Sequence, residues 1–314
     1  MPLTPYNKAW LTQAEFVDRF VQRGLIVNDR PSAEQFLSHV NYYRLSGYCL
    51  AFEIPGQRHS FIPGTTFEHL RATYDFDFAL RDLVSEALEV VEIDLRTTVA
   101  HHFGQKYGAF GHTDPAHFYR RPPVRAKDPR PTFGHAAWLT RVREDVQRSK
   151  ERFVEHFRKT YSEAANHDLP VWALSEVVSF GCISKMIDGM VSADQRVVAS
   201  RYRLQNLVLV SWAHHLNVAR NVCAHHSRLW DRLWGVPPEF PAGNNWRPPF
   251  LMNNQRLTVT LLVIYQMLKH MPAAQDWATV WQVRLRKLLA RIPAATVTPA
   301  LGFTDQWFAN PLWI

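Results

Sequence analysis

The chain has 314 residues, enough for one large domain or two modest ones with a hydrophobic core. Hydrophobic residues make up 46% and charged residues 20%, a composition that excludes a disordered chain. The formal net charge of +8 favours an anionic partner such as nucleic acid. Three scattered cysteines indicate a reducing compartment rather than a disulfide framework. Because we find no signal-peptide pattern and no apolar run long enough to cross a bilayer, we expect a cytoplasmic protein without membrane spans.

Two short helices are predicted near the N-terminus. Thr12 and Glu15 form a capping box, which opens a helix that Gly24 stops. Ser32 with Gln35 is expected to open the second helix, which presents its apolar side chains on one face.

A dense aromatic segment follows at residues 41–48. Its tyrosines Tyr42, Tyr43 and Tyr48 are the right side chains for stacking on bases, but we expect most of them in the core, with Arg44 as an ion-pair donor. A loop or β-like stretch then runs from Phe52 to Gly64. We therefore predict an N-terminal helical segment over residues 1–66.

The predicted core, residues 67–235, is built on long helices. Apolar residues recur every three or four positions from about Phe67, which predicts one long amphipathic helix that ends near Gly104 or Gly108. Pro170 starts a further helix, which Gly181 breaks or packs. A long helix is expected over residues 204–227. Residues 236–314 are predicted to add a loop region and two helices, at 255–271 and 276–291, that pack on the core. The expected fold class is all-α.

A basic insertion is predicted at residues 120–160. Residues 120–134 are rich in proline, so they form a linker or extended loop, and a charged helix follows over 135–160. Residues 120–159 contain twelve Lys or Arg and five Asp or Glu, an excess of seven positive charges. The segment is either a solvated face or an RNA-backbone contact, and we favour the contact. The residues chosen for it are Arg120, Arg121, Arg125, Lys127 and Arg130.

The segment that points most clearly to chemistry is Arg220-Asn221-Val222-Cys223-Ala224-His225, at the predicted end of a helix. A guanidinium can clamp a phosphate, and an imidazole can act as acid or base beside it. Asn221 and His225 share a helix face, but Arg220 lies about 140° round from His225. A complete site therefore needs a second helix, from the same chain or from a partner.

A candidate second motif is Arg96 with His101, which has the same spacing on the long helix. Glu92, four residues before Arg96, is placed to orient its guanidinium. The neighbouring Cys223 and histidines lack the paired spacing of a zinc site, so no metal and no cofactor is predicted. Cys223 is expected to be a small buried residue.

Several segments together resemble the Abi-like (AbiD/AbiF) abortive-infection family of bacterial phage-defence proteins, which in turn resembles the HEPN superfamily of helical ribonucleases. The matching segments, in family order, are Asn41–Tyr48, Tyr74–Asp77 with Leu80-Arg81, Glu92–Arg96, Trp172, Glu176, Ser179–Gly181, Arg220–His226 and Arg228–Trp230. They cover roughly residues 10–235.

The resemblance implies a HEPN-like helical bundle with an additional N-terminal helical segment. It also implies metal-independent RNA cleavage by attack of the 2′-OH on the adjacent phosphate. His225 would be the acid or base, Arg220 would stabilise the phosphoryl charge, and Asn221 would position either Arg220 or the substrate. Such enzymes usually build the site across a dimer, and some AbiF-like proteins are paired with a small non-coding RNA. Glu92 and Arg96 match the family, whereas His101 has no role assigned by it.

We therefore predict an endoribonuclease toxin of a phage-defence (abortive infection) or toxin–antitoxin system. Its expected partners are a structured small non-coding RNA, a single-stranded RNA substrate and a second copy of the chain. Two alternatives belong to other classes. One is a non-catalytic RNA-binding scaffold with a degenerate site, and the other is an interaction module that senses a phage component.

Overall fold

The computed structural model describes residues 5, 9–119, 133–292 and 300–314, and within these residues the protein is all-helical, as predicted. The described part has twelve α-helices and no strand, with three isolated β-bridges between loops. The helices are α1 Gln13–Gln22, α2 Arg30–His39, α3 Tyr42–Cys49, α4 Phe67–Tyr107, α5 His135–Arg148, α6 Arg152–Thr160, α7 Val171–Val177, α8 Phe180–Gly189, α9 Ser192–Ser200, α10 Asn206–Ala224, α11 Leu257–His270 and α12 Gln275–Leu289.

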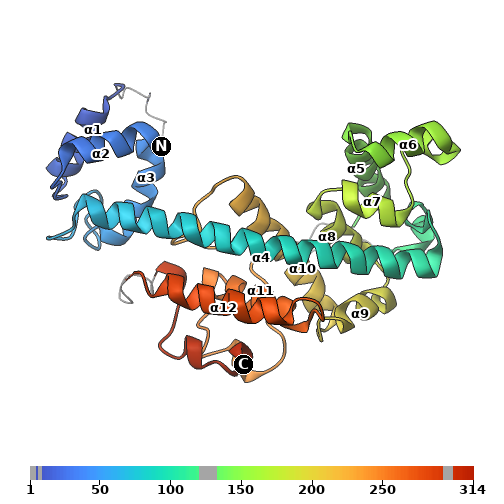
Figure 1. Cartoon of the computed structure of the whole chain (residues 1–314). Coiled ribbons are helices and arrows are strands. Elements are labelled where there is room, and N and C mark those ends of the chain that lie inside the picture. The colour runs from blue at the N-terminus through green and yellow to red at the C-terminus, as the bar shows by residue number, and fades with distance from the viewer. Residues whose placement is uncertain (1–4, 6–8, 120–132, 293–299) are drawn as a thin grey trace.

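Helix α4 is the axis of the molecule. It has 41 residues, so it is about 60 Å long at the usual helical rise. At its start the backbone N–H of Thr66 donates to His69 Nδ1 at 3.2 Å. It ends where Gly108 adopts φ +76°, a left-handed value that glycine reaches without strain, which confirms the predicted end. Figure 1 shows α4 crossing the whole molecule, with α1 to α3 at one end and α5 to α8 at the other.

The N-terminal helices confirm one predicted start and correct another. The capping box of α1 is present, because Thr12 and Glu15 exchange hydrogen bonds of 2.7 and 3.2 Å. The start predicted for α2 at Ser32 is wrong. Asp29 caps this helix by accepting from the Ser32 N–H at 3.0 Å, and Pro31 lies in its first turn.

The aromatic segment at residues 41–48 forms most of α3. Tyr42 and Tyr48 are buried as expected, whereas Tyr43 is 67% exposed. The expected ion pair of Arg44 is wrong, since its guanidinium donates to the carbonyl of His226 at 2.5 Å. The apolar cluster around α1 to α3 includes Phe67 and Leu70, so it is continuous with the first turns of α4.

The charged helix predicted over residues 135–160 is two helices, α5 and α6. Ser149 has extended backbone angles, and Arg158 donates to the carbonyls of Val146 and Gln147 at the end of α5. Arg158 of the following helix thus satisfies carbonyls in the last turn of α5. The chain therefore breaks between the two helices without a glycine or a proline at that point.

A break also divides the helical segment after Pro170. Helix α7 starts at Val171 as predicted, and Ser179 caps α8 by accepting from the Cys182 N–H. Gly181 lies inside the first turn of α8, where a Cβ would be 3.6 Å from the Asn217 side chain. It therefore packs this helix against α10 and does not break it.

Helix α10 runs antiparallel along α4. Asp77, in the first half of α4, accepts from the N–H of Leu229 just after α10, whereas Asp94, further along α4, pairs with Arg201 just before it. Buried side chains of both helices belong to the main hydrophobic core.

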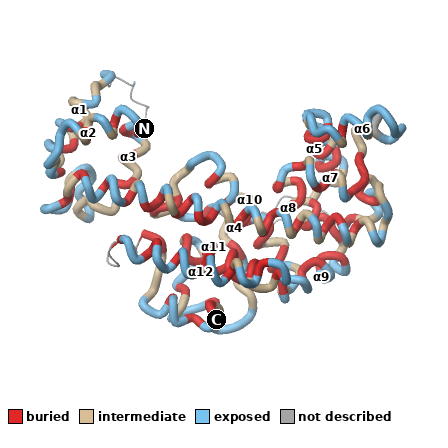
Figure 2. Tube along the Cα trace, viewed as in Figure 1, coloured by how far each residue is buried: buried red, intermediate tan, exposed pale blue. Residues whose placement is uncertain are grey.

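The last two helices cover another face of α4. In α11, residues 257–268 are all buried, and the Trp281 indole of α12 donates to the Leu83 carbonyl of α4 at 2.9 Å. Figure 2 shows the buried residues concentrated where α4, α10 and α11 meet. In the described part of the chain, no helix has the length and apolar character needed to cross a membrane.

Candidate functional site

The candidate site lies where α10 ends. The last turn closes with a Schellman motif, in which Ser227 N–H donates to Val222 O at 2.9 Å and His226 N–H donates to Cys223 O at 2.9 Å. His226 takes the left-handed position at φ +54°, where glycine is usual. His225 is therefore the capping residue, and its side chain is exposed.

Glu92 joins the two arginines of the two predicted motifs. Arg96 Nε donates to Glu92 Oε1 at 3.0 Å, which is the expected i,i+4 pair. Arg220 Nε lies 3.4 Å from Glu92 Oε2. The side chains of Glu92 and Arg96 are each only 12% exposed, whereas that of Arg220 is 45% exposed. The arginines of the two motifs thus meet within one chain through a shared carboxylate.

Arg96 and Arg220 differ in how many of their guanidinium N–H donors remain available to a ligand. Arg96 also donates through Nη1 to the carbonyls of Ser175 and Val178, at 2.5 and 2.6 Å, so its guanidinium ties α4 to the end of α7. Arg220 is held on one side by Glu92, and its Nη1 lies 3.5 Å from Asn221 Oδ1. Arg220 is therefore the arginine available to an anion from solvent, and Arg96 acts as a brace.

His101 lies away from this pair. It is exposed on α4 and lines a pocket of about 320 Å³ beside α9, formed with Thr97, His102, Gln105 and Arg201 among others. Five residues turn a helix by about 140°, so Arg96 and His101 face different neighbours. The predicted second motif is thus brought to the site in part, by Glu92 and Arg96 only.

A buried carboxylate anchors the chain that follows the site. Asp77 accepts from the N–H groups of Leu229 and Trp230, at 3.1 and 2.7 Å, and from the Tyr48 hydroxyl at 2.6 Å. The buried Arg81 pairs with the same carboxylate. The residues of this anchor lie in segments that resemble the family, but sequence reasoning assigned it no role. The signal was an acidic residue on the apolar face of α4, where only a paired charge is stable.

The basic residues chosen for RNA contact, Arg120, Arg121, Arg125, Lys127 and Arg130, lie outside the described residues. Most arginines of α5 and α6 are engaged within the chain: Arg141 and Arg148 pair with Asp145, and Arg143 pairs with Asp168. The exposed cations with no partner among the described interactions of this segment are Lys150, Arg152 and Lys159.

The cysteine beside the site is inert. Cys223 is 5% exposed, as expected for a small core residue, and burial raises the pKa of its thiol to about 11. In the described residues, no group of three His, Cys, Asp or Glu is arranged to hold a metal ion.

The geometry thus defines an all-helical protein with an exposed arginine and histidine at one helix end, braced by a long central helix. The sequence model described as "Abi-like protein" matches residues 35–231, which is more than half of the chain and includes both motifs. The protein therefore belongs to the Abi-like family. The chain matches no curated protein and no solved structure.

Proposed function

We propose that this Abi-like protein is a metal-independent endoribonuclease of the HEPN type, acting in phage defence or as the toxin of a toxin–antitoxin system. The observation that supports this most is the end of α10, where Arg220 is exposed yet oriented by the buried Glu92, and where His225 is exposed. Abi-like family membership supports the abortive-infection role.

Each proposed catalytic group has one task. In the transition state, the imidazole of His225 takes the 2′-OH proton or gives a proton to the leaving 5′-oxygen, and solvent water makes the other of these two proton transfers. The 2′-oxygen bonds to phosphorus as the P–O5′ bond breaks, which leaves a 2′,3′-cyclic phosphate and a 5′-hydroxyl. The Arg220 guanidinium stabilises the negative charge on the phosphoryl oxygens. Asn221 holds Arg220 through its side-chain oxygen.

The separation of Arg220 and His225 supports a site made by two copies of the chain. Five residues of helix separate them by about 7.5 Å along the axis and by about 140° around it, so they diverge. We propose that the active form is a two-fold dimer in which the ends of α10 lie together and Arg220 of one copy acts with His225 of the other.

A structured small RNA is the proposed regulator. The net charge of +8 and the exposed Lys150, Arg152 and Lys159 support binding of an RNA backbone. The residues between 120 and 130 contribute five further Lys or Arg to this proposal.

The test compares wild type with His225→Ala on labelled single-stranded RNA in EDTA, after removal of co-purified RNA. We expect wild type to produce cyclic-phosphate ends and His225→Ala to lose at least a hundredfold in rate. His226→Asn is the matched control, because asparagine tolerates the left-handed backbone at this position, and it should cut normally.

The other outcomes identify the alternatives. RNA binding by both proteins with no cleavage by either would favour a non-catalytic scaffold. Absence of RNA binding would favour a phage-sensing interaction module and would overturn the proposed function.

A further inference from the structure

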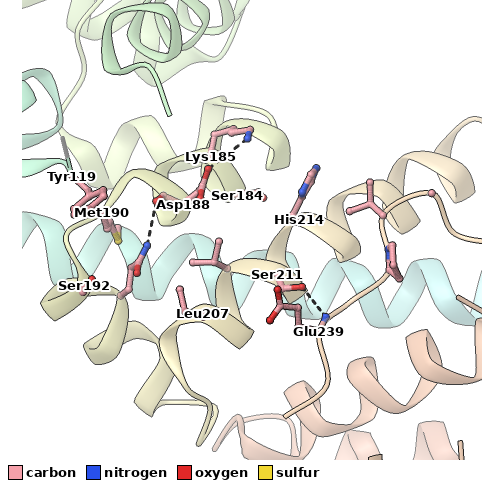
Figure 3. Close-up of a pocket in the computed structure, with 15 residues that line it drawn as sticks. Tyr119, Ser184, Lys185, Asp188, Met190, Ser192, Leu207, Ser211, His214 and Glu239 are labelled. Atoms are coloured by element: carbon pink, nitrogen blue, oxygen red, sulfur yellow. Dashed lines mark hydrogen bonds and ion pairs between the residues drawn. The ribbon is translucent and has the colours of Figure 1, made fainter. Parts of the chain in front are cut away.

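A pocket of about 640 Å³ lies between α8, the first half of α10 and the loop at residues 235–239. Figure 3 shows Lys185 and Asp188 of α8 on one side, Leu207, Ser211 and His214 of α10 on another, and Tyr119 at one end. Its size is in the range of pockets that bind small molecules or single nucleotide units.

The pocket and the candidate site lie on the same face of α10. Leu207, Ser211, His214, Asn221 and His225 fall within a sector of about 80° around the helix axis, centred on Leu207 and His225. None of these five residues is buried. His214 precedes His225 by 11 residues, about 16 Å along the helix. A single strand whose backbone reaches His225 can therefore extend along this face to the pocket.

The lining favours a base over a phosphate. Apolar side chains of Met190, Leu207 and Val236 form part of the wall. Lys185 pairs with Asp188 at 3.6 Å, so with Glu239 the lining has one excess negative charge, which disfavours an anion. An uncharged base suits this lining better than a phosphate does.

His214 and Tyr119 add the features that recognise a planar ligand. Burial, and then the charge of Lys185, lower the pKa of His214, so its neutral ring offers one donor and one acceptor at pH 7. Tyr119 is 46% exposed at the rim, and its backbone is held by donation from its N–H to the Gly189 carbonyl at 2.7 Å. An exposed aromatic ring can serve as a stacking platform.

We propose that this pocket binds an unstacked nucleobase of the single-stranded RNA, a few nucleotides from the bond cut at His225. This inference rests on the proposed function for the identity of the strand. It assigns the pocket a role in choosing where the RNA is cut.

The binding test uses a single-stranded RNA containing one 2-aminopurine, whose fluorescence changes when the base leaves the stack and enters a pocket. All proteins contain His225→Ala, so that no RNA is cut. His214→Ala and Tyr119→Ala remove the recognising groups. His39→Ala and Tyr43→Ala are matched controls, because both residues are exposed on the N-terminal helices at the far end of α4.

We expect His214→Ala and Tyr119→Ala each to weaken binding about tenfold and to reduce the fluorescence change, while both controls leave them unaltered. Unchanged binding and fluorescence in both pocket variants would overturn the proposal. Equal affinity for free AMP and for the RNA would also overturn it, because the ligand would then be a free nucleotide.

A second arm uses cutting-competent protein and sequences the ends produced from RNA of random sequence. Wild type should show a base preference at one fixed distance from the cut, and His214→Ala should cut with that preference lost. If His214→Ala cuts with the base preference retained, the proposed role of the pocket is wrong and the proposed function still holds. Base binding without any cutting would overturn the proposed function and leave the pocket standing.

Discussion

The carboxylate of Glu92 contacts two guanidinium groups. Its Oε1 pairs with Arg96, whose remaining nitrogen bonds carbonyls of α7, and its Oε2 lies 3.4 Å from Arg220. One carboxylate thus pairs with two guanidinium groups, which leaves one net positive charge. Because Arg220 is the exposed guanidinium, this charge is accessible there. That distribution leaves Arg220 oriented while it keeps its attraction for a phosphate.

Glu92→Gln should therefore impair cleavage more than binding. The amide keeps the size of the side chain but loses the charge that orients Arg220, and we expect kcat to fall about tenfold to a hundredfold with a smaller change in KM. Steady-state cleavage kinetics measure this split, with thermal unfolding to verify the fold. Glu89→Gln, an exposed residue one turn earlier on α4, should behave like wild type. Equal losses in both variants would show that Glu92 has no positioning role.

Asp77 acts on the fold beneath the site. It is fully buried and accepts from two backbone N–H groups, from Tyr48 and from the buried Arg81. Removal of the carboxylate leaves the Arg81 charge and these donors without an acceptor.

Asp77→Ala should reduce the free energy of unfolding by about 3–5 kcal/mol, as for other broken buried pairs. Chemical denaturation monitored by circular dichroism measures the loss. The exposed Asp82→Ala on the same helix should change stability by less than about 0.5 kcal/mol. A small effect at Asp77 would mean that the segment after α10 is held by its apolar contacts.

At the scale of helices, His215 joins three segments. Its Nδ1 is 2.7 Å from the Val236 carbonyl, which can only accept, so Nδ1 bears the proton. Its Nε2 is 2.9 Å from Thr260 Oγ1 and then accepts the hydroxyl proton. The neutral ring thus connects α10 to α11 and to the loop between them, and burial lowers its pKa to about 4.

This depressed pKa predicts how stability changes with pH. Between pH 6.5 and pH 4, His215 binds a proton in the unfolded state but not in the folded state. The neutral ring therefore contributes fully to the free energy of unfolding above pH 6.5, and this contribution is lost as the pH falls towards 4. The loss from this group is about 3 kcal/mol. Urea unfolding across this range should show a shallower pH dependence for His215→Gln. An identical slope in the variant would show that His215 is not the titrating group. The buried His112, whose pKa is also lowered to about 4, should preserve part of the slope.

The sequence predicted the elements that local rules determine. The periodic apolar stripe defined α4, and Thr12 with Glu15 and Gly108 marked helix ends, because these signals depend only on neighbouring residues. The start of α2 was misjudged because Asp29 and Ser32 are both good capping residues three positions apart. The break between α5 and α6 depends on Arg158 reaching back to the preceding helix, which no local pattern records.

The residues of the candidate site could be proposed from the sequence, but their contacts within the fold could not. The positions of Arg220 and His225 on α10 predicted that one helix could not aim both at one point. The contact of Arg220 with Glu92 depends on the antiparallel packing of α4 and α10, which joins residues far apart in sequence. Likewise Arg44 was expected in an ion pair, but the turn after α10 presents the His226 carbonyl to it instead.

At the scale of the whole molecule, the proposed sharing of one site by two copies predicts complementation between inactive variants. Arg220→Ala and His225→Ala should each be inactive alone. In a mixed dimer, one of the two sites combines an intact arginine with an intact histidine, so random mixing should restore about a quarter of wild-type activity. Cleavage assays after denaturation and joint refolding of equal amounts measure the recovery. No recovery, with dimers present by sedimentation, would place both groups of each site in one chain.

The burial of α11 has a consequence for how the protein is made. Twelve successive residues of this helix are enclosed by other parts of the chain, and they follow the whole segment that contains the site. While the ribosome is still adding α11, the apolar surfaces of α4 and α10 that it will cover are open to water. The nascent chain therefore leaves these surfaces uncovered until α11, Leu257–His270, has emerged. The part of α10 that carries the candidate site is thus made before the helix that completes the core around it.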